Sequence, residues 1–264
     1  MKKLLTWITV SAIIFSCSPV KIAVNDTGWS QKEELAVKGR QGFLIKQKLS
    51  FGEFKTSTVK RSWTKGSSWG FGMGLANDWV ESLNIEWVKR KQTVRFNLTD
   101  EKGNQSEVTA FSKVQWRDFT IGNNPTSIVN IIGDIMKIGD AGTNTYAVRI
   151  FPSKNEHPWE MLIDNNAAQL KAKTYTGLLA KSKNEYYTVA PVYKLMNKQG
   201  KAVALPLGGS VGFEFKDQNG NSVAAVSLID NGVVYFNKVS PQEKFLLANA
   251  AAALLLQQQL DEGA

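Results

Sequence analysis

The strongest constraint on this chain is a stretch near its C-terminus that is apolar on every side. All but one of residues 245–256 are Phe, Leu or Ala. Ser240, Pro241 and Glu243 precede them as N-cap, first helical residue and capping-box partner, and predict a helix over 241–258. Its apolar part would be about 18 Å long, which is too short to cross a bilayer. A helix that is apolar all round must be buried by protein, so the rest of the chain has to surround it.

Several segments alternate apolar and polar residues, as strands with one buried face do. The alternation runs through residues 45–51, 94–99, 146–150 and 211–215. Strands that surround a helix favour a sheet that bends back on itself. The sequence therefore predicts a mostly β fold, either an antiparallel barrel or a strongly curved sheet, with a buried C-terminal helix.

Three turn sequences separate apolar-alternating runs, at 100–104, 197–201 and 217–221. Each opens with Asp or Asn, whose side chain caps the turn, and has Gly in the fourth position, where a positive φ is needed. The segments around the first and third, 96–108 and 213–226, resemble each other. The resemblance has two interpretations, an internal duplication or two hairpins of a common type.

Residues 127–138 interrupt the β pattern with an apolar run whose only charges are Asp134 and Lys137. One interpretation is a lid or contact surface that includes Ile132 and Ile135, because a large exposed apolar patch usually marks an interaction site. The other is a small amphipathic helix that closes one end of the barrel with its charges outward.

The first residues have the pattern of a secretory signal. Lys2 and Lys3 precede an apolar stretch at 4–15, which is too short for a spanning helix and fits a cleaved signal peptide. Cys17 follows it and is the only cysteine, so in an exported chain it cannot form an internal disulfide. The alternative is an ordinary signal peptide with an accidental cysteine. The expected organisation is a signal peptide (1–16), a lipidated cysteine with a polar tether (17–34) and one β-rich domain (35–264).

The segment Ile14-Phe15-Ser16-Cys17 resembles a bacterial lipobox, and its Phe15 resembles the looser lipoboxes of Bacteroidota lipoproteins. The resemblance implies that Cys17 carries diacylglycerol and anchors the protein to a membrane. Ser18, with no acidic cluster after it, implies the outer membrane and a domain that faces the periplasm. The whole chain is similar to Bacteroidota lipoproteins, a resemblance that implies no activity.

The C-terminal part combines a strand at 212–216, an Asp-x-x-Gly hairpin, strands at 223–229 and 233–237, and the apolar helix. This order resembles the end of tubby-like barrels, a superfamily that includes tubby, LURP-one-related and phospholipid-scramblase domains. The resemblance implies a barrel threaded by its last helix. It rests on pattern without a diagnostic motif, and the phosphoinositide-binding residues of tubby cannot be placed in this chain, so no site is carried over.

Residues of the common catalytic types are scarce. His157 is the only histidine and lies in a predicted loop, so neither a zinc site nor a Ser-His-Asp triad is expected. Gly70, Gly72 and Gly74 lack the spacing of a dinucleotide fingerprint. The sequence therefore predicts no catalytic residue, no metal and no cofactor. A pair of Asp or Glu residues that act on a glycoside is the alternative left open.

Seven tryptophans remain after the expected cleavage. Trp63 and Trp69 flank a turn at 65–68 and are the predicted exposed pair. Exposed indole rings stack on sugars or lie at a lipid interface. The competing interpretation is that both rings pack in the core.

The formal charge of +9 is spread along the chain. It fits either plain solubility or attraction to anionic lipid or acidic polysaccharide. Nucleic acid is not an expected partner, because the chain has an export signal and no nucleic-acid motif. The expected function is that of a lipid-anchored envelope protein that binds a glycan, an anionic lipid or another envelope protein. The alternatives are an envelope enzyme that acts on glycans or lipids through Asp and Glu, and a subunit of an envelope assembly.

Overall fold

A computed structural model describes residues 20–24, 32–40, 46–62, 92–114, 144–152, 157–206 and 208–257. The predicted signal peptide, Cys17 and the segment 127–138 lie outside these ranges. The elements in chain order are β1 (Lys21–Ile22), β2 (Glu33–Ala36), β3 (Ser50–Phe51), β4 (Phe54–Thr56), β5 (Lys60–Ser62), β6 (Gln92–Thr99), β7 (Gln105–Val114), β8 (Thr145–Phe151), β9 (Trp159–Asp164), α2 (Asn165–Leu170), β10 (Gly177–Ser182), β11 (Glu185–Val192), β12 (Lys194–Met196), β13 (Ala202–Ala204), β14 (Gly212–Lys216), β15 (Ser222–Ser227), β16 (Val233–Phe236) and α3 (Pro241–Leu256).

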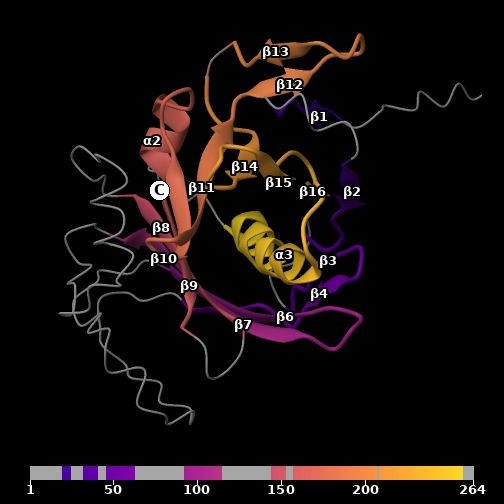
Figure 1. The fold of residues 1–264 in the computed structure, drawn as a ribbon, viewed down its shortest axis with the longest axis vertical. Helices are drawn as coiled ribbons and strands as arrows, with labels where there is room; N and C mark the ends of the chain where they lie inside the picture. Colours follow the sequence, from indigo (N-terminus) through magenta and orange to yellow (C-terminus); the bar gives the residue numbers. More distant parts are fainter. Residues whose placement is uncertain are drawn as a thin grey trace, which may run out of the picture.

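In the described residues, thirteen strands form one antiparallel sheet, and twelve of them follow one another around a nearly closed barrel (Figure 1). Their order around the barrel is β2-β16-β15-β14-β11-β10-β9-β8-β7-β6-β4-β3, and β5 also pairs with β6. Two backbone hydrogen bonds of 2.9 and 3.1 Å between Lys38, which follows β2, and Ser50 in β3 join the two ends. The predicted fold class, a mostly β barrel or curved sheet with a C-terminal helix, is confirmed.

Helix α3 runs inside the barrel (Figure 1). Residues 245–256 are all buried, and most of them have no exposed surface. A closed sheet of about eight strands is filled by its own side chains, whereas one of about eleven encloses a helix. Twelve strands therefore leave room for α3, which ends at Leu256 rather than at the predicted residue 258. Among the described residues, no helix has the length and apolarity to span a membrane.

The predicted capping box begins this helix. The Ser240 hydroxyl accepts a hydrogen bond from the Glu243 N–H at 3.3 Å, and the Glu243 carboxylate accepts one from the Ser240 N–H at 3.0 Å. Next to them, Lys244 forms ion pairs with Glu33 at 2.8 Å and with Glu53 at 2.9 Å. The first turn of α3 is thus stabilised by hydrogen bonds within its cap and by ion pairs to the surrounding strands.

Polar contacts fix the helix within its apolar surroundings. Oδ1 of the fully buried Asn249 accepts a hydrogen bond from the Ser106 hydroxyl at 2.5 Å. The Tyr146 hydroxyl donates to the Ala253 carbonyl at 2.7 Å, and Arg40 donates to a backbone carbonyl in the last turn at 3.1 Å. Because apolar packing alone is non-directional, these hydrogen bonds set the rotation and depth of α3 in the barrel.

The three predicted turns share one geometry. In each, the first side chain accepts hydrogen bonds from the backbone N–H groups two and four residues later, at 2.8 to 3.0 Å. The glycine in the fourth position has a φ between 73° and 84°. The turn at 197–201 belongs to a different sheet, yet it has the same geometry. The similarity of the other two turns therefore does not by itself require a duplication.

A second sheet, ordered β1-β12-β13, packs on the outside of the barrel (Figure 1). Its Ile22 is 1 % exposed and forms a small apolar cluster with Val192, Ala225 and Tyr235. Strand β1 and the first residues of β2 lie in the segment 17–34, which the sequence assigned to a tether. The folded structure therefore begins before residue 35, because a short polar segment can still pair its backbone with an existing strand.

The segment 45–51, which alternates apolar and polar residues, forms a regular strand only at its end. Gln47, Leu49 and Phe51 are buried on one face, as the pattern predicts. Lys46 has a φ of 58°, however, and the regular strand is limited to β3. A positive φ is incompatible with an extended strand, so the alternation of burial continues without regular pairing.

Candidate functional site

The structure does not test the candidate residues chosen from the sequence. Trp63, Trp69, Ile132 and Ile135 lie outside the described residues, as does the predicted lipidation site Cys17. The candidate site described below was therefore not identified from the sequence.

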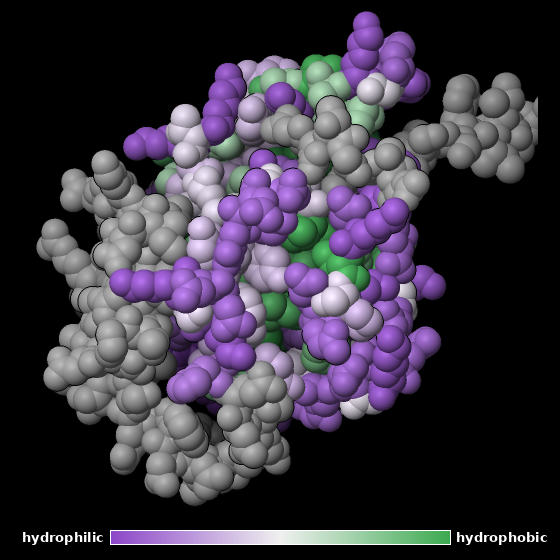
Figure 2. Space-filling model, viewed as in Figure 1, coloured by the Kyte–Doolittle hydropathy of each residue, from purple (hydrophilic) through white to green (hydrophobic). Residues whose placement is uncertain are grey.

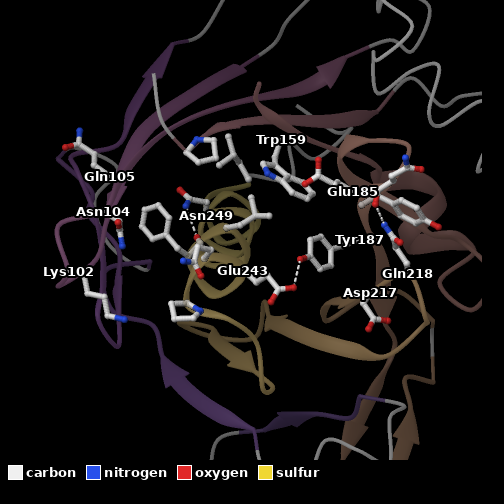
Figure 3. Close-up of a pocket in the computed structure, with 18 of the residues that line it drawn as sticks. Lys102, Asn104, Gln105, Trp159, Glu185, Tyr187, Asp217, Gln218, Glu243 and Asn249 are labelled. Carbon is white, nitrogen blue, oxygen red and sulfur yellow. Dashed lines mark hydrogen bonds between the residues drawn. The ribbon is translucent and has the colours of Figure 1, made fainter. Parts of the chain in front are cut away.

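One end of the barrel holds a pocket of about 980 Å³, at the level where α3 begins (Figure 3). The hairpin turns β6–β7, β10–β11 and β14–β15 form its rim, together with the facing ends of β8 and β9 and the first turns of α3. We call it the rim pocket. It is lined by Lys102, Asn104, Gln105, Ile150, Pro152, Trp159, Asn184, Glu185, Tyr186, Tyr187, Asp217, Gln218, Asn219, Pro241, Gln242, Glu243, Phe245, Leu246 and Asn249.

Local sequence explains why polar groups gather on this rim. The Asx turns at 100–104 and 217–221 need Asp, Asn and Gly for their backbone geometry, and these residues are polar or small. Antiparallel strands place alternate turns at the same end of a barrel. Figure 3 shows Lys102 and Asn104 on one side of α3, and Glu185 and Gln218 on the other.

The floor of the rim pocket is part of the barrel interior. It includes Phe245, Leu246 and Asn249 of α3, together with Ile150 of β8. The side-chain amide of Asn249 donates to the Phe245 carbonyl at 2.8 Å, and its oxygen is engaged by Ser106. The floor is therefore apolar apart from one amide that already has partners within the protein.

A chain of contacts fixes the aromatic wall of the pocket. The Tyr187 hydroxyl donates to the Glu243 carboxylate at 3.0 Å (Figure 3). The ring of Tyr187 lies 5.7 Å from that of Trp159, with an interplanar angle of 36°. Burial, and then the hydrogen bond to this carboxylate, raises the pKa of the Tyr187 hydroxyl. The two rings are held in place before any ligand binds.

Glu243 is held in its ionised form. Its second oxygen accepts hydrogen bonds from the Ser240 hydroxyl at 2.7 Å and from the Ser240 N–H. These hydrogen bonds lower the pKa of Glu243 below its usual value, and the one from the Ser240 hydroxyl has the largest effect. The hydrogen bond from Tyr187 lowers the pKa further. Because its pKa is lowered, this carboxyl group is ionised at neutral pH. It therefore accepts hydrogen bonds and does not supply a proton.

The lining has the opposite charge from the whole chain. Glu185, Asp217 and Glu243 contribute three negative charges against one positive charge from Lys102, a formal balance of −2. The chain carries +9. Carboxamides form the largest group of polar side chains in the lining: Asn104, Gln105, Asn184, Gln218, Asn219, Gln242 and Asn249. Because opposite charges attract, the pocket favours neutral or cationic groups over anions.

The lining contains no histidine and no cysteine. Within the described residues, no group of three or more His, Cys, Asp or Glu side chains is placed to hold a metal ion. His157 is exposed in the loop before β9. The carboxamides, carboxylates and aromatic rings of the lining can offer hydrogen bonds and aromatic contact.

Sequence reasoning missed Trp159, Tyr187 and the pocket face of Glu243. Trp159 was one of seven tryptophans without a distinguishing neighbour, and Glu243 was assigned only to the helix cap. The Asx turns were visible, but only the strand order shows that two of them border the same opening. Comparisons of the chain with protein-family models, with curated proteins and with solved structures found no match.

Proposed function

We propose that the protein binds a neutral or amino-bearing carbohydrate in the rim pocket and that it does not transform it. The observation that carries the proposal is the lining itself, where aromatic rings and carboxamides surround a pocket of about 980 Å³. Pockets for small ligands have volumes of about 300–1,000 Å³. A pocket of this size accommodates one or two sugar rings.

The chemistry of the lining matches the surface of a sugar. Each sugar hydroxyl both donates and accepts hydrogen bonds, and each carboxamide offers a donor and an acceptor side by side. The C–H face of a sugar ring is apolar and stacks on an aromatic ring. Trp159 is only partly buried and lines the opening, so its indole is the side chain best placed for that contact.

Glu243 is not suited to be the acid of a glycoside hydrolase. A hydrolase of the usual kind needs one carboxylic acid with a raised pKa to protonate the leaving oxygen. The pKa of Glu243 is lowered instead, and both of its oxygens accept hydrogen bonds from the protein. Its role in this proposal is to position Tyr187.

The setting proposed for this binding is the cell envelope. We infer a lipid anchor at Cys17 from its position after the apolar stretch 4–15 and the small residue Ser16. We also propose, from the order of the last strands and the C-terminal helix in the sequence, that the chain belongs to the tubby-like superfamily. Neither inference is needed for the sugar-binding proposal, which depends on the pocket alone.

The test is calorimetric titration of the protein with cello-, malto- and chito-oligosaccharides and with oligomers of glucosamine. We expect binding of at least one of these series, and we expect Trp159→Leu to weaken it about tenfold or more. Glu185→Gln removes a charge from the pocket and should weaken glucosamine oligomers more than neutral ones. Glu107→Gln is the matched control, because Glu107 is equally exposed and lies outside the lining.

Two results would contradict the proposal. One is a lack of heat and of thermal stabilisation with every neutral and amino-bearing series. The other is binding that Trp159→Leu leaves unchanged while the melting curve shows that the variant is folded. Release of free sugar during the titration would instead favour an enzyme.

A further inference from the structure

The outer face of the barrel carries a second charged surface, made of residues that do not line the rim pocket. It consists of exposed cations on and next to β3, β4, β5 and β6. Figure 2 shows hydrophilic residues covering the side where Figure 1 places β3 and β4. We call this surface the cationic wall, and its members are Lys38, Lys46, Lys48, Lys55, Lys60 and Arg95.

Strand pairing brings these cations together. Lys60 lies directly opposite Arg95 in the pairing of β5 with β6. The Val59 N–H donates to the Gln47 carbonyl at 2.8 Å, which brings the backbone of Lys46 next to that of Lys60. These three cations therefore follow one another across adjacent segments, which are about 5 Å apart in a sheet.

A second row crosses the same face. Lys38 pairs with Ser50, Ser50 pairs with Lys55, and Lys55 pairs with Thr99. Side chains of directly paired residues stand on the same face of a sheet. The exposed Lys48 lies in the chain between Lys46 of the first row and Ser50 of the second. The hydroxyl groups of Ser50 and Thr99 therefore lie among the cations. The amide of Asn97 does so as well, because Asn97 is the outward residue of β6 between Arg95 and Thr99.

Within the described residues, the positive charges of the wall are not compensated by ion pairs. In the part of the chain that the structure describes, none of the six makes an ion pair with a carboxylate. Some cations outside the wall do have carboxylate partners: Arg149 of β8 pairs with Glu160 at 2.9 Å, and Lys21 of the second sheet pairs with Glu34 at 2.9 Å. Like charges directly opposite each other destabilise a sheet. An arrangement that costs stability and leaves the cations unpaired fits an external anionic partner.

We propose that the cationic wall binds an acidic polysaccharide. Such a chain presents carboxylates separated by hydroxyl-bearing rings, which matches cations separated by hydroxyl and amide side chains. A lipid surface is less well matched, because the large hydrophobic side chains exposed in the described residues are Val20, Leu170 and Val203, none of which belongs to the wall. Among the described residues, the wall therefore offers no large apolar side chain to insert among lipid chains.

This inference does not rest on the proposed sugar-binding function. The rim pocket has a formal charge of −2 and disfavours an acidic chain, whereas the wall consists of cations on the outer surface. The two sites therefore prefer ligands of different charge. An acidic polysaccharide and a neutral oligosaccharide should bind at the same time without competing.

The experiment uses the full chain and polygalacturonate as the probe, with affinity measured at several salt concentrations. The test variant carries Lys48→Glu, Lys55→Glu and Lys60→Glu. The matched control carries Lys173→Glu, Lys198→Glu and Lys201→Glu, which are equally exposed and change the net charge by the same amount. We expect the test variant to lose affinity about tenfold or more and the control to change little. Affinity of the unaltered protein should fall as salt rises.

Three outcomes would overturn the proposal. Equal losses in both variants would show that only net charge matters. Unchanged binding in the test variant, with a melting curve that shows it folded, would place the polyanion elsewhere. If the test variant kept its affinity for polygalacturonate but lost binding to vesicles that contain phosphatidylglycerol, the wall would face a lipid surface instead.

Discussion

The buried hydrogen bond between Asn249 and Ser106 gives the sharpest test of how the barrel holds its helix. Asn249 has no exposed surface and Ser106 is 2 % exposed, so both partners of this hydrogen bond are buried. In Ser106→Ala, Oδ1 of Asn249 would lose its donor. A buried polar group without a partner costs about 1–3 kcal/mol. We expect this variant to lose about that much of its free energy of unfolding.

The double variant distinguishes this explanation from simple loss of packing. Asn249→Leu also removes the hydrogen bond that the side-chain amide donates to the Phe245 carbonyl, but that carbonyl can still accept a backbone hydrogen bond within α3. Replacing both partners with apolar groups leaves no orphaned atom, so Ser106→Ala together with Asn249→Leu should cost less than the sum of the single changes. We expect a coupling free energy of about 1 kcal/mol or more.

The measurement is equilibrium unfolding in urea for the four proteins of this cycle. The slope of unfolding free energy against urea must be the same in all four, because a change in slope would signal an altered unfolded or native state. A Ser106→Ala cost below about 0.5 kcal/mol, or strict additivity in the double variant, would refute the reasoning. Either result would mean that Asn249 finds another partner inside the barrel.

Two further predictions concern a titrating group and the N-terminus. The pKa of Glu243 in the folded protein lies below its ordinary value of 4.5. Its stabilising contribution is therefore present above about that pH and is lost as the pH falls through the lower, folded value. Glu243→Gln should reduce the loss of stability on acidification, as measured by urea unfolding between neutral and acid pH, and an unchanged acid limb would contradict this. Cys17→Ala should move the protein from the membrane to the soluble fraction; unchanged membrane association, with no lipid mass on the unaltered protein, would contradict the proposed anchor.

Local features of the fold were predictable from the sequence. The helix cap at Ser240 and the three Asx turns depend on residues within five positions of one another, so the chain carries them wherever it folds. The burial of α3 was predictable as well, because an all-apolar helix too short for a bilayer has no other stable environment.

The candidate site was not predictable in the same way. Trp159, Tyr187 and Glu243 come from β9, β11 and α3, and nothing local marks them as neighbours. The cationic wall likewise depends on the pairing of β5 with β6, which are separated by residues 63–91. An alternating pattern shows which face of a strand is buried, but it does not show which strand lies beside it.

The sequence by itself determined that this protein is mostly β, where its turns fall and that its last helix is buried. Only the tertiary structure decided that β2 pairs with β16, that Lys38 joins Ser50 and that three hairpins open at one end beside the start of α3. The physical reason is that caps and turns are stabilised by contacts within a few residues. The order and register of strands depend instead on contacts between distant segments, which form only when the whole barrel closes around the helix.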